Sequence, residues 1–262
     1  MPDDIRGKVA VVTGGATGIG RGVALEFGRL GAKVVVSTGS NVEGGEAVAK
    51  SIRDEGGEAV FVRCDVSKEP DVVHLVEESV EIYGRIDCAF NNAGVGPDGV
   101  RMSYNLLTEL DEADWDRVME VNAKGVFLCM KHEIRRMVKQ GGGSIVNTAS
   151  IGGLHMVPTF GAYGPSKAAV IAVTRLAAAE NAKHGIRINV VCPGPTLGTE
   201  LMKNSMLTGG AAAGGKSGPV IPLGKMGQVD DVAHAVIWLS SNFAGHITGH
   251  ALPVDGGMVD IG

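Results

Sequence analysis

The segment that decides the fold reads Lys8-Val-Ala-Val-Val-Thr-Gly-Gly-Ala-Thr-Gly-Ile-Gly20. Its first half, up to Thr13, is a short apolar run rich in β-branched residues, which is typical of a buried strand. Residues 21–30 then have the apolar spacing of a helix. Glycines at such a junction let the backbone approach a pyrophosphate, and the helix start offers N–H donors. The segment therefore predicts a dinucleotide site, although a tight strand-to-helix turn alone would also use glycines.

The alternation of strand and helix continues along the chain. Further strands are expected at residues 33–37, 59–64, 86–91, 144–149, 187–192 and 251–254, and further helices at 42–55, 70–83, 111–139, 162–184 and 230–240. This alternation predicts a Rossmann-like, doubly wound α/β fold, with about seven parallel strands and helices on both faces. Ligands of such sheets bind beyond the carboxyl ends of the strands, where Gly14, Asp65, Asn91, Ser150 and Pro193 would lie.

Two stretches interrupt this rhythm, at residues 95–107 and 197–225. The second contains Thr-Gly-Gly-Ala-Ala-Ala-Gly-Gly-Lys-Ser-Gly-Pro, which has little to pack with. It is interpreted either as a lid over the ligand or as an ordinary surface loop. The sequence shows neither an internal repeat nor a linker, so one domain over residues 1–262 is expected.

Composition limits the possible partners and the setting. A net charge of −5 argues against general binding to nucleic acid or anionic membranes and favours small-molecule partners. The chain shows no apolar signal core and no run near the roughly 18 apolar residues of a membrane span. The four cysteines lack metal-ligand spacing, which predicts buried free thiols, no metal site and a cytoplasmic setting.

A second motif, between Ser150 and Lys167, carries the chemistry. Tyr163 and Lys167 are four residues apart, so a helix over 162–184 would place them on one face. An ammonium beside the phenol would lower the tyrosine pKa from about 10, and Ser150 could reach the same pocket from the sheet. These three groups suit a carbonyl oxygen that gains or loses a proton. A tyrosine and a lysine at this spacing also occur by chance on many helices.

Taken together, these residues resemble the classical short-chain dehydrogenase/reductase family over roughly residues 8–257. The motifs that carry the resemblance are Thr13-Gly14-x-x-x-Gly18-x-Gly20, Asp65, Asn91-Asn92-Ala93-Gly94, Asn122, Ser150, Tyr163-x-x-x-Lys167 and Pro193-Gly194. Each motif is weak alone, but together, in this order and spacing, they are specific. The threonine that usually follows the Pro-Gly pair by four positions comes one later here, unless Thr196 takes its role.

The resemblance implies a role for each catalytic residue. Tyr163 would be the general acid in carbonyl reduction and the base in alcohol oxidation. Lys167 would lower the Tyr163 pKa and hold the nicotinamide ribose, while Ser150 would hydrogen-bond the substrate oxygen. Asn122 would help hold a water that links Lys167 to solvent, or would only bend its helix. His155 is expected at the substrate, where it would shape or polarise the pocket wall rather than act as a catalyst.

The resemblance also implies a set of cofactor contacts, from the pyrophosphate through the adenine to the nicotinamide. These residues are Gly14, Gly18, Ile19, Gly20, Arg21, Thr38, Ser40, Asp65, Val66, Asn92, Ala93, Gly94, Tyr163, Lys167, Pro193, Gly194 and Thr196.

The end of the second expected strand bears on which nicotinamide is used. This segment, residues 37–41, lacks the acidic residue that pairs with the 2′-hydroxyl of NAD(H). Its small hydroxyls resemble a segment that accepts the 2′-phosphate. Arg21 is the only cation obviously nearby, and the basic residue usual in the family at the position of Thr17 or Gly39 is absent. NADP(H) is therefore favoured, and NAD(H) stays open.

These residues predict an oxidoreductase that interconverts a ketone or aldehyde with an alcohol. Its pocket would be lined by the segment 197–225 and by the largely apolar set Val95, Leu154, His155, Met156, Val157 and Phe160. Such a pocket suits a cyclic, polyketide-like, steroid-like or acyl-thioester carbonyl compound. The alternative is a catalytically silent nicotinamide-binding or scaffold protein. The resemblance further implies a homotetramer that pairs helices 111–139 and 162–184.

Overall fold

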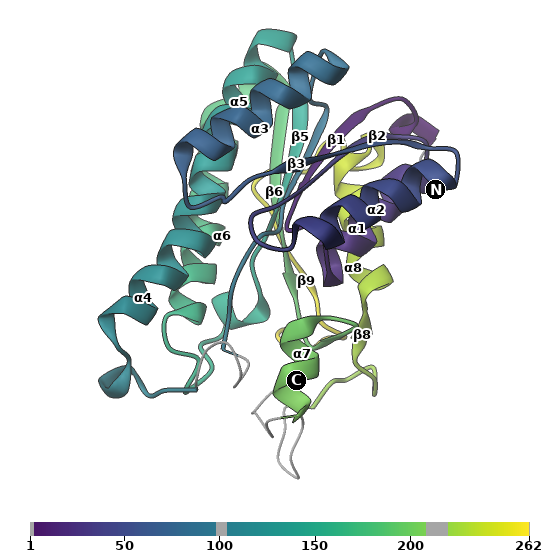
Figure 1. The fold of residues 1–262 in the computed structure, drawn as a ribbon. Coiled ribbons are helices and arrows are strands. Elements are labelled where there is room, and N and C mark those ends of the chain that lie inside the picture. Colours follow the sequence, from purple (N-terminus) through teal and green to yellow (C-terminus); the bar gives the residue numbers. More distant parts are fainter. Residues whose placement is uncertain (1–2, 98–103, 208–219, 262) are drawn as a thin grey trace.

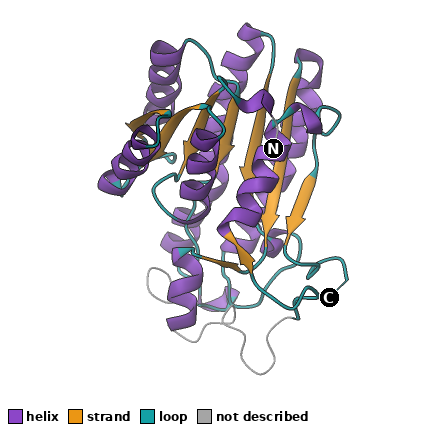
Figure 2. Ribbon diagram, turned by 90° about the vertical axis from the view of Figure 1, so that its right-hand side faces the viewer, coloured by secondary structure: helices purple, strands orange, loops and turns teal. Residues whose placement is uncertain are grey.

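The computed structural model describes residues 3–97, 104–207 and 220–261, and its centre is a parallel sheet (Figures 1 and 2). Seven strands are hydrogen-bonded in the order β3-β2-β1-β4-β5-β6-β9, which confirms the predicted doubly wound architecture. The strands are β1 Val9–Thr13, β2 Lys33–Thr38, β3 Glu58–Arg63, β4 Cys88–Asn91, β5 Gly143–Thr148, β6 Ile186–Pro193 and β9 Ala251–Val254. The order reverses at β1, so the carboxyl ends of β1 and β4 flank a ligand crevice.

Helices cover both faces of the sheet. In Figure 1, α3, α5 and α6 lie on one side and α1, α2 and α8 on the other. The main helices are α1 Gly18–Arg29, α2 Val42–Asp54, α3 Glu69–Tyr83, α4 Glu112–Val118, α5 Gly125–Gln140, α6 Tyr163–Asn181, α7 Glu200–Leu207 and α8 Val229–Ser240. Short 3₁₀ turns are at Asp3–Ile5, Leu107–Glu109, Ile151–Gly153, Ala182–His184 and Asn242–Ala244.

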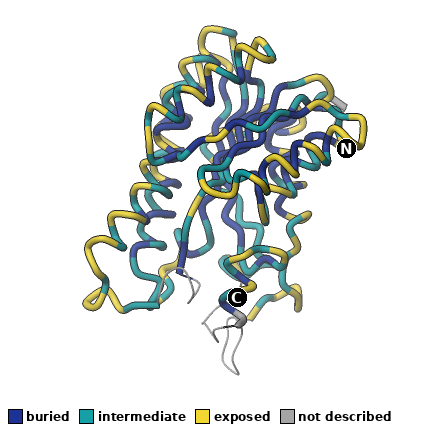
Figure 3. Tube along the Cα trace, in the orientation of Figure 1, coloured by how far each residue is buried: buried dark blue, intermediate teal, exposed yellow. Residues whose placement is uncertain are grey.

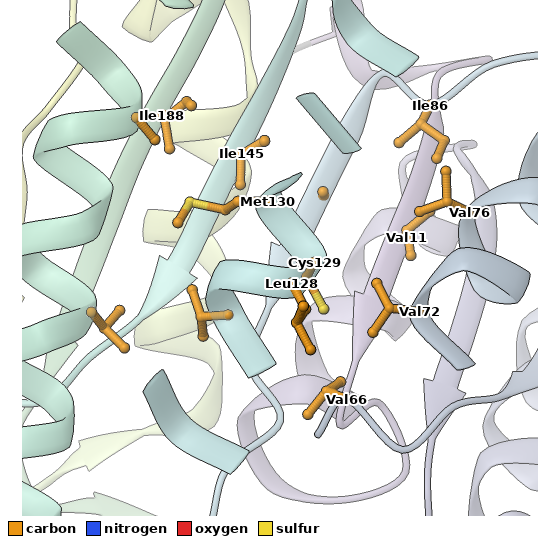
Figure 4. Close-up of a cluster of buried hydrophobic side chains, with 14 of the residues drawn as sticks. Val11, Val66, Val72, Val76, Ile86, Leu128, Cys129, Met130, Ile145 and Ile188 are labelled. Atoms are coloured by element: carbon orange, nitrogen blue, oxygen red, sulfur yellow. The ribbon is translucent and has the colours of Figure 1, made fainter. Parts of the chain in front are cut away.

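The sheet separates two hydrophobic cores, and this explains why the sequence of β1 is apolar almost throughout. All five residues of β1 are buried. Val11 packs into the core under α3, α5 and α6, shown in Figure 4, whereas Val12 packs into the core under α1, α2 and α8. Successive side chains of a strand point to opposite faces, so a strand covered on both sides needs apolar residues at every position. Figure 3 shows the buried sheet between helices whose outer sides are exposed.

The long helix predicted over residues 111–139 is present, and its hydrogen-bonding pattern changes midway. A π-helical segment, Met119–Lys124, separates α4 from α5. The predicted helix is therefore confirmed, and a π-helical segment lies in its middle. The side chain of Asn122 is bonded to the backbone of Val95, which gives the helix a tertiary contact at this point. Such π segments occur frequently at functional sites.

Other boundaries moved by one turn or less. The first helix begins at Gly18 rather than at residue 21. The α-helical part of the predicted 162–184 helix ends at Asn181 and continues as a 3₁₀ turn, after which Gly185 adopts a φ of 70°. This left-handed conformation is the usual glycine stop after a helix.

The segment predicted as a lid or loop, residues 197–225, contains regular structure among its described residues. It contains α7, and a short strand β7, Thr196–Leu197, pairs with β8, Gly227–Gln228. Residues 208–219 of this segment, and 98–103 of the other irregular stretch, lie outside the described residues. All four cysteines are free and buried, as predicted. Among the described residues, no helix is both long and apolar enough to cross a bilayer.

Candidate active site

A cavity of about 1670 Å³ opens beyond the carboxyl ends of the strands. The cavity gathers most of the residues that the sequence singled out for cofactor and substrate. These are Gly14, Gly18, Ile19, Thr38, Ser40, Asp65, Val66, Asn92, Ala93, Gly94, Ser150, His155, Tyr163, Lys167, Pro193, Gly194 and Thr196. Gly20, Arg21 and Asn122 do not line it.

The glycine turn forms one wall by close backbone packing. Gly14 has a φ of 65°, and a Cβ atom there would lie 2.9 Å from the Cα of Ala93. A Cβ atom on Gly20 would lie only 2.2 Å from the carbonyl oxygen of Gly14. Gly20 therefore lets α1 approach the turn instead of facing the cavity. Thr17 makes no side-chain cap, so it leaves N–H groups at the start of α1 to a ligand. These features fit a bound pyrophosphate.

Hydrogen bonds hold the neighbouring strand ends in place. The Thr13 hydroxyl accepts from the backbone N–H of Asn92 at 3.0 Å and from that of Ala93 at 3.3 Å. The Asn92 amide donates to the carbonyls of Thr13 and Gly14, both at 3.4 Å. The ends of β1 and β4 therefore form one rigid floor for the crevice.

Ser150, Tyr163 and Lys167 come together at the opposite wall. Tyr163 is the first residue of α6, and Lys167 follows one turn later, with its Nζ 5.7 Å from the centroid of the Tyr163 ring. The Lys167 ammonium donates to the Thr148 carbonyl at 2.9 Å. The Ser150 hydroxyl lies in the same group: it accepts from the Gly152 N–H at 3.0 Å and hydrogen-bonds Tyr163. The predicted juxtaposition of a phenol, an ammonium and a hydroxyl is therefore present.

The electrostatics of this group differ from the expectation. Burial raises the pKa of Tyr163 above its usual value, and the hydrogen bond with Ser150 opposes this increase. Burial lowers the pKa of Lys167 to about 8. The expected lowered pKa of Tyr163 is not found in this structure, because the cost of burying a phenolate dominates.

Asn122 lies behind the cavity wall. It is fully buried: its Oδ1 accepts from the Val95 N–H and its Nδ2 donates to the Val95 carbonyl, both at 2.8 Å. A Cβ atom on Gly94 would lie 3.1 Å from Asn122 Oδ1 and 3.4 Å from Lys167 Nζ. Asn122 thus fixes the loop that packs beside Lys167, and this accounts for the helix distortion considered from the sequence.

Part of the cavity lining is apolar. Val157, Phe160, Met202, Val220 and Met258 line it, together with His155. Rings continue this surface, since Phe160 is 6.3 Å from Tyr163 and 5.9 Å from Tyr104 between ring centroids. The Tyr104 hydroxyl is hydrogen-bonded to Ser205 of α7. The predicted segment around Phe160 and α7 therefore meet around one apolar compartment.

Comparison with known proteins identifies the family. A family model described as enoyl-(acyl carrier protein) reductase matches residues 14–259. Relatives over the full length include a 2,5-dichloro-2,5-cyclohexadiene-1,4-diol dehydrogenase of Sphingobium indicum, 39% identical over 98% of this chain and 99% of that protein. The chain is a short-chain dehydrogenase/reductase. The prediction from the motifs is confirmed, and the chain is an oxidoreductase of this family.

Two further similarities show the range of this short-chain dehydrogenase/reductase's relatives. A 3-oxoacyl-[acyl-carrier-protein] reductase of Staphylococcus aureus is 36% identical over 96% of this chain and 98% of its own length. The crystal structure of levodione reductase matches with a TM-score of 0.88 and 33% identity, covering 96% of this chain and 97% of that one.

Several cavity residues of this short-chain dehydrogenase/reductase were not predicted. Arg63 and Met258 line the cavity, whereas the predicted pocket residues Leu154 and Met156 do not. Leu201 and Met202 also line it and belong to the segment 197–225 that was predicted to do so. Leu154 packs on the hydrophobic core and Met156 is 56% exposed. Arg63 could have been found from strand order, because it ends the strand beside the one that ends at Thr38. Met258 belongs to no motif and is brought in by the chain segment after β9.

The two threonines of the 193–199 segment have different positions. Thr196 is buried in β7, and its hydroxyl donates to the Gly194 carbonyl at 2.9 Å. The Thr199 hydroxyl donates to the Thr196 carbonyl and accepts from the Met202 N–H at 3.2 Å, which caps α7. Both threonines line the cavity, although Thr199 comes one position later than the usual threonine of the family.

Proposed function

We propose that this chain is an NADP(H)-preferring enzyme that interconverts a ketone and a secondary alcohol on a compact, mainly apolar substrate. The observation that carries the proposal is the group of Ser150, Tyr163 and Lys167 between a glycine-walled crevice and an apolar compartment. This arrangement provides one end for a nucleotide and one end for a carbonyl compound, with a proton donor between them.

In carbonyl reduction, the Tyr163 hydroxyl donates a proton to the carbonyl oxygen, and the Ser150 hydroxyl donates a hydrogen bond to the same oxygen. A nicotinamide, whose ribose Lys167 would hold, would supply the hydride for the carbonyl carbon. Because burial raises the Tyr163 pKa, the phenol is protonated near neutral pH, which is the state needed for reduction. In alcohol oxidation, Tyr163 must lose this proton first, so oxidation is expected to gain from higher pH.

The cofactor would lie along the crevice from β3 to β6. Gly14 and Gly18 would face its pyrophosphate, Asp65 and Val66 its adenine, and Lys167 its nicotinamide ribose. NADP(H) is favoured over NAD(H) because the end of β2 carries small hydroxyls and no carboxylate. The fit of the glycine turn to a pyrophosphate supports a dinucleotide of either kind.

For the substrate, we favour a cyclic ketone or the corresponding ring alcohol. The apolar compartment with Phe160 supports this choice, as do the ring substrates in the names of the levodione reductase and the cyclohexadiene-diol dehydrogenase. A second candidate is an acyl thioester, which the similarity to the 3-oxoacyl-[acyl-carrier-protein] reductase supports. α7 contributes Met202 to the compartment, so residues 197–225 are proposed to be the substrate loop of a one-domain enzyme.

The substitution Tyr163→Phe tests the proposal. It removes only the proton donor, so we expect turnover to fall by about 10²- to 10⁴-fold. Affinity for NADPH, followed by nicotinamide fluorescence, should stay within about threefold, because phenylalanine keeps the aromatic ring and loses only the hydroxyl group. The substrates to compare are a cyclic diketone, a cyclic diol and an acetoacetyl thioester.

Tyr83→Phe is the matched control, since Tyr83 ends α3 outside the cavity. It should leave both turnover and affinity unchanged. Binding of NADPH without turnover of any carbonyl or alcohol by the wild-type protein would support the silent binding protein instead.

We also propose a cytoplasmic homotetramer. Phe127 on α5 and Leu176 on α6 are 46% and 58% exposed, which supports pairing of these helices between copies. Four buried free thiols suit a reducing compartment. Sedimentation of a monomer at micromolar concentration would contradict the tetramer.

A further inference from the structure

We infer that Arg63, the last residue of β3, binds the 2′-phosphate of NADP(H) and sets the preference for this cofactor over NAD(H). The inference rests on the nicotinamide site of the proposed function and adds the residue that selects between the two cofactors. Arg63 lies in neither of the two segments that the sequence singled out for the phosphates, the glycine turn and the end of β2.

The sheet register brings Arg63 to the phosphate end of the crevice. Arg63 is the direct neighbour of Thr38, the last residue of β2. Both residues line the cavity, together with Gly39 and Ser40. The end of β2 is where the adenosine ribose lies in doubly wound sheets, so its 2′ substituent would lie near these residues.

The Arg63 guanidinium is held without being neutralised. Its Nε donates to the Gly39 carbonyl at 3.1 Å, which fixes the plane of the group at the end of β2. In the described part of the chain, no carboxylate lies within ion-pair distance of Arg63. A planar guanidinium with two NH₂ groups available is well suited to bidentate binding of a phosphate.

The nearby acids do not cancel this charge. The Asp65 carboxylate accepts from the N–H and the hydroxyl of Ser67 at 3.1 and 2.7 Å and pairs with Lys68 at 3.5 Å. These contacts satisfy Asp65 on the adenine side. Glu43, in the first turn of α2, is exposed, so solvent screens its charge.

Close packing explains why the cation comes from β3. A Cβ atom on Gly39 would lie 3.1 Å from the Asp65 Cα and 3.2 Å from the Cys64 carbonyl oxygen. A side chain at position 39, acidic or basic, would therefore require the two loops to separate. Arg21, the cation expected from the sequence, lines a different groove with Glu26 and Asp230. Arg63 is thus the guanidinium that this fold brings to the end of β2.

The experiment compares NADPH and NADH binding by fluorescence titration in the wild-type protein, Arg63→Ala and Arg63→Lys. We expect Arg63→Ala to weaken NADPH binding about 10- to 100-fold and to change NADH binding less than about threefold. Arg63→Lys should be intermediate, because an ammonium is a point charge without the planar fork. Arg85→Ala, an exposed arginine outside the cavity, is the matched control and should leave both affinities unchanged.

Titration with adenosine 2′,5′-bisphosphate and with 5′-AMP gives a second readout that needs no turnover. Arg63→Ala should lose affinity only for the bisphosphate. An equal loss for both nucleotides, or no loss for either, would overturn the inference.

The two proposals fail in distinguishable ways. If Arg63→Ala still turns over the ketone and its preference for NADPH over NADH is unchanged, this inference alone is overturned. Selective loss of bisphosphate binding in a protein that turns over no ketone would contradict the proposed reaction and support the role of Arg63.

Discussion

A buried acid beneath the sheet edge gives a sharp test of the structure. Glu133 on α5 is 1% exposed. The Asn91 amide donates to Glu133 Oε2 at 2.9 Å and to Asn147 Oδ1 at 3.0 Å. Burial raises the pKa of Glu133 from 4.5 to about 7, although the hydrogen bond from Asn91 opposes the increase. The folded protein therefore retains a proton on Glu133 that the unfolded chain releases.

The sign and size of the effect follow from this difference in pKa. Between pH 4.5 and about 7 the folded state binds one proton more than the unfolded state, so the free energy of unfolding decreases as pH rises. At about 1.4 kcal/mol per pH unit, the total is about 3 kcal/mol. This contribution is fully present below pH 4.5 and is lost above about pH 7. Glu133→Gln keeps an acceptor for Asn91 and removes the titration.

Urea denaturation of the wild type and Glu133→Gln at pH 5 and pH 8 measures the effect, at one protein concentration. The stability of the variant relative to the wild type should increase by about 2.5 kcal/mol between the two pH values, because part of the total is already lost at pH 5. Glu81→Gln, an exposed change on α3, should show no such increase. If the free energies of unfolding of the wild type and Glu133→Gln differ by the same amount at pH 5 and pH 8, the reasoning is refuted.

Two further predictions concern the glycine turn and the buried lysine. Gly20→Ala should lower the free energy of unfolding by about 1–3 kcal/mol and weaken NADPH binding, because the new methyl group would meet the Gly14 carbonyl; wild-type stability in urea would contradict this. Burial lowers the Lys167 pKa from 10.5 to about 8. Burying the charged ammonium therefore destabilises the folded state below pH 8, and this destabilisation decreases as pH rises from 8 to 10.5. Wild-type stability should therefore increase by about 3 kcal/mol over that range, whereas Lys167→Met should show neither the increase nor turnover.

The sequence predicted those parts of the protein that depend on local pattern. The apolar run ending at Thr13 and the glycines after it imply a strand and a close helix, and the four-residue spacing of Tyr163 and Lys167 places both on one helix face. Such features need no knowledge of distant contacts. They were enough to predict the sheet and the position of the site at its carboxyl edge.

The features that the sequence did not predict depend on tertiary contacts. The π segment at Asn122 accompanies bonds to the distant Val95 backbone. The raised Tyr163 pKa depends on how deeply the phenol is buried, which spacing alone does not reveal. The position of Arg63 depends on the pairing of β2 with β3, and the contribution of Met258 depends on the path of the chain after β9.

The strand order has a consequence for how enzymes with this fold diversify. Arg63 and Thr38 lie at the β3 edge of the sheet, whereas the chain segments that bring Met202 and Met258 follow β6 and β9 at the other edge. The two sets share no element, and free energies at separate sites usually add. Mutations that change the redox cofactor can therefore accumulate without altering substrate choice. Exchange of the β2–β3 ends between homologous enzymes should accordingly transfer coenzyme preference as a module.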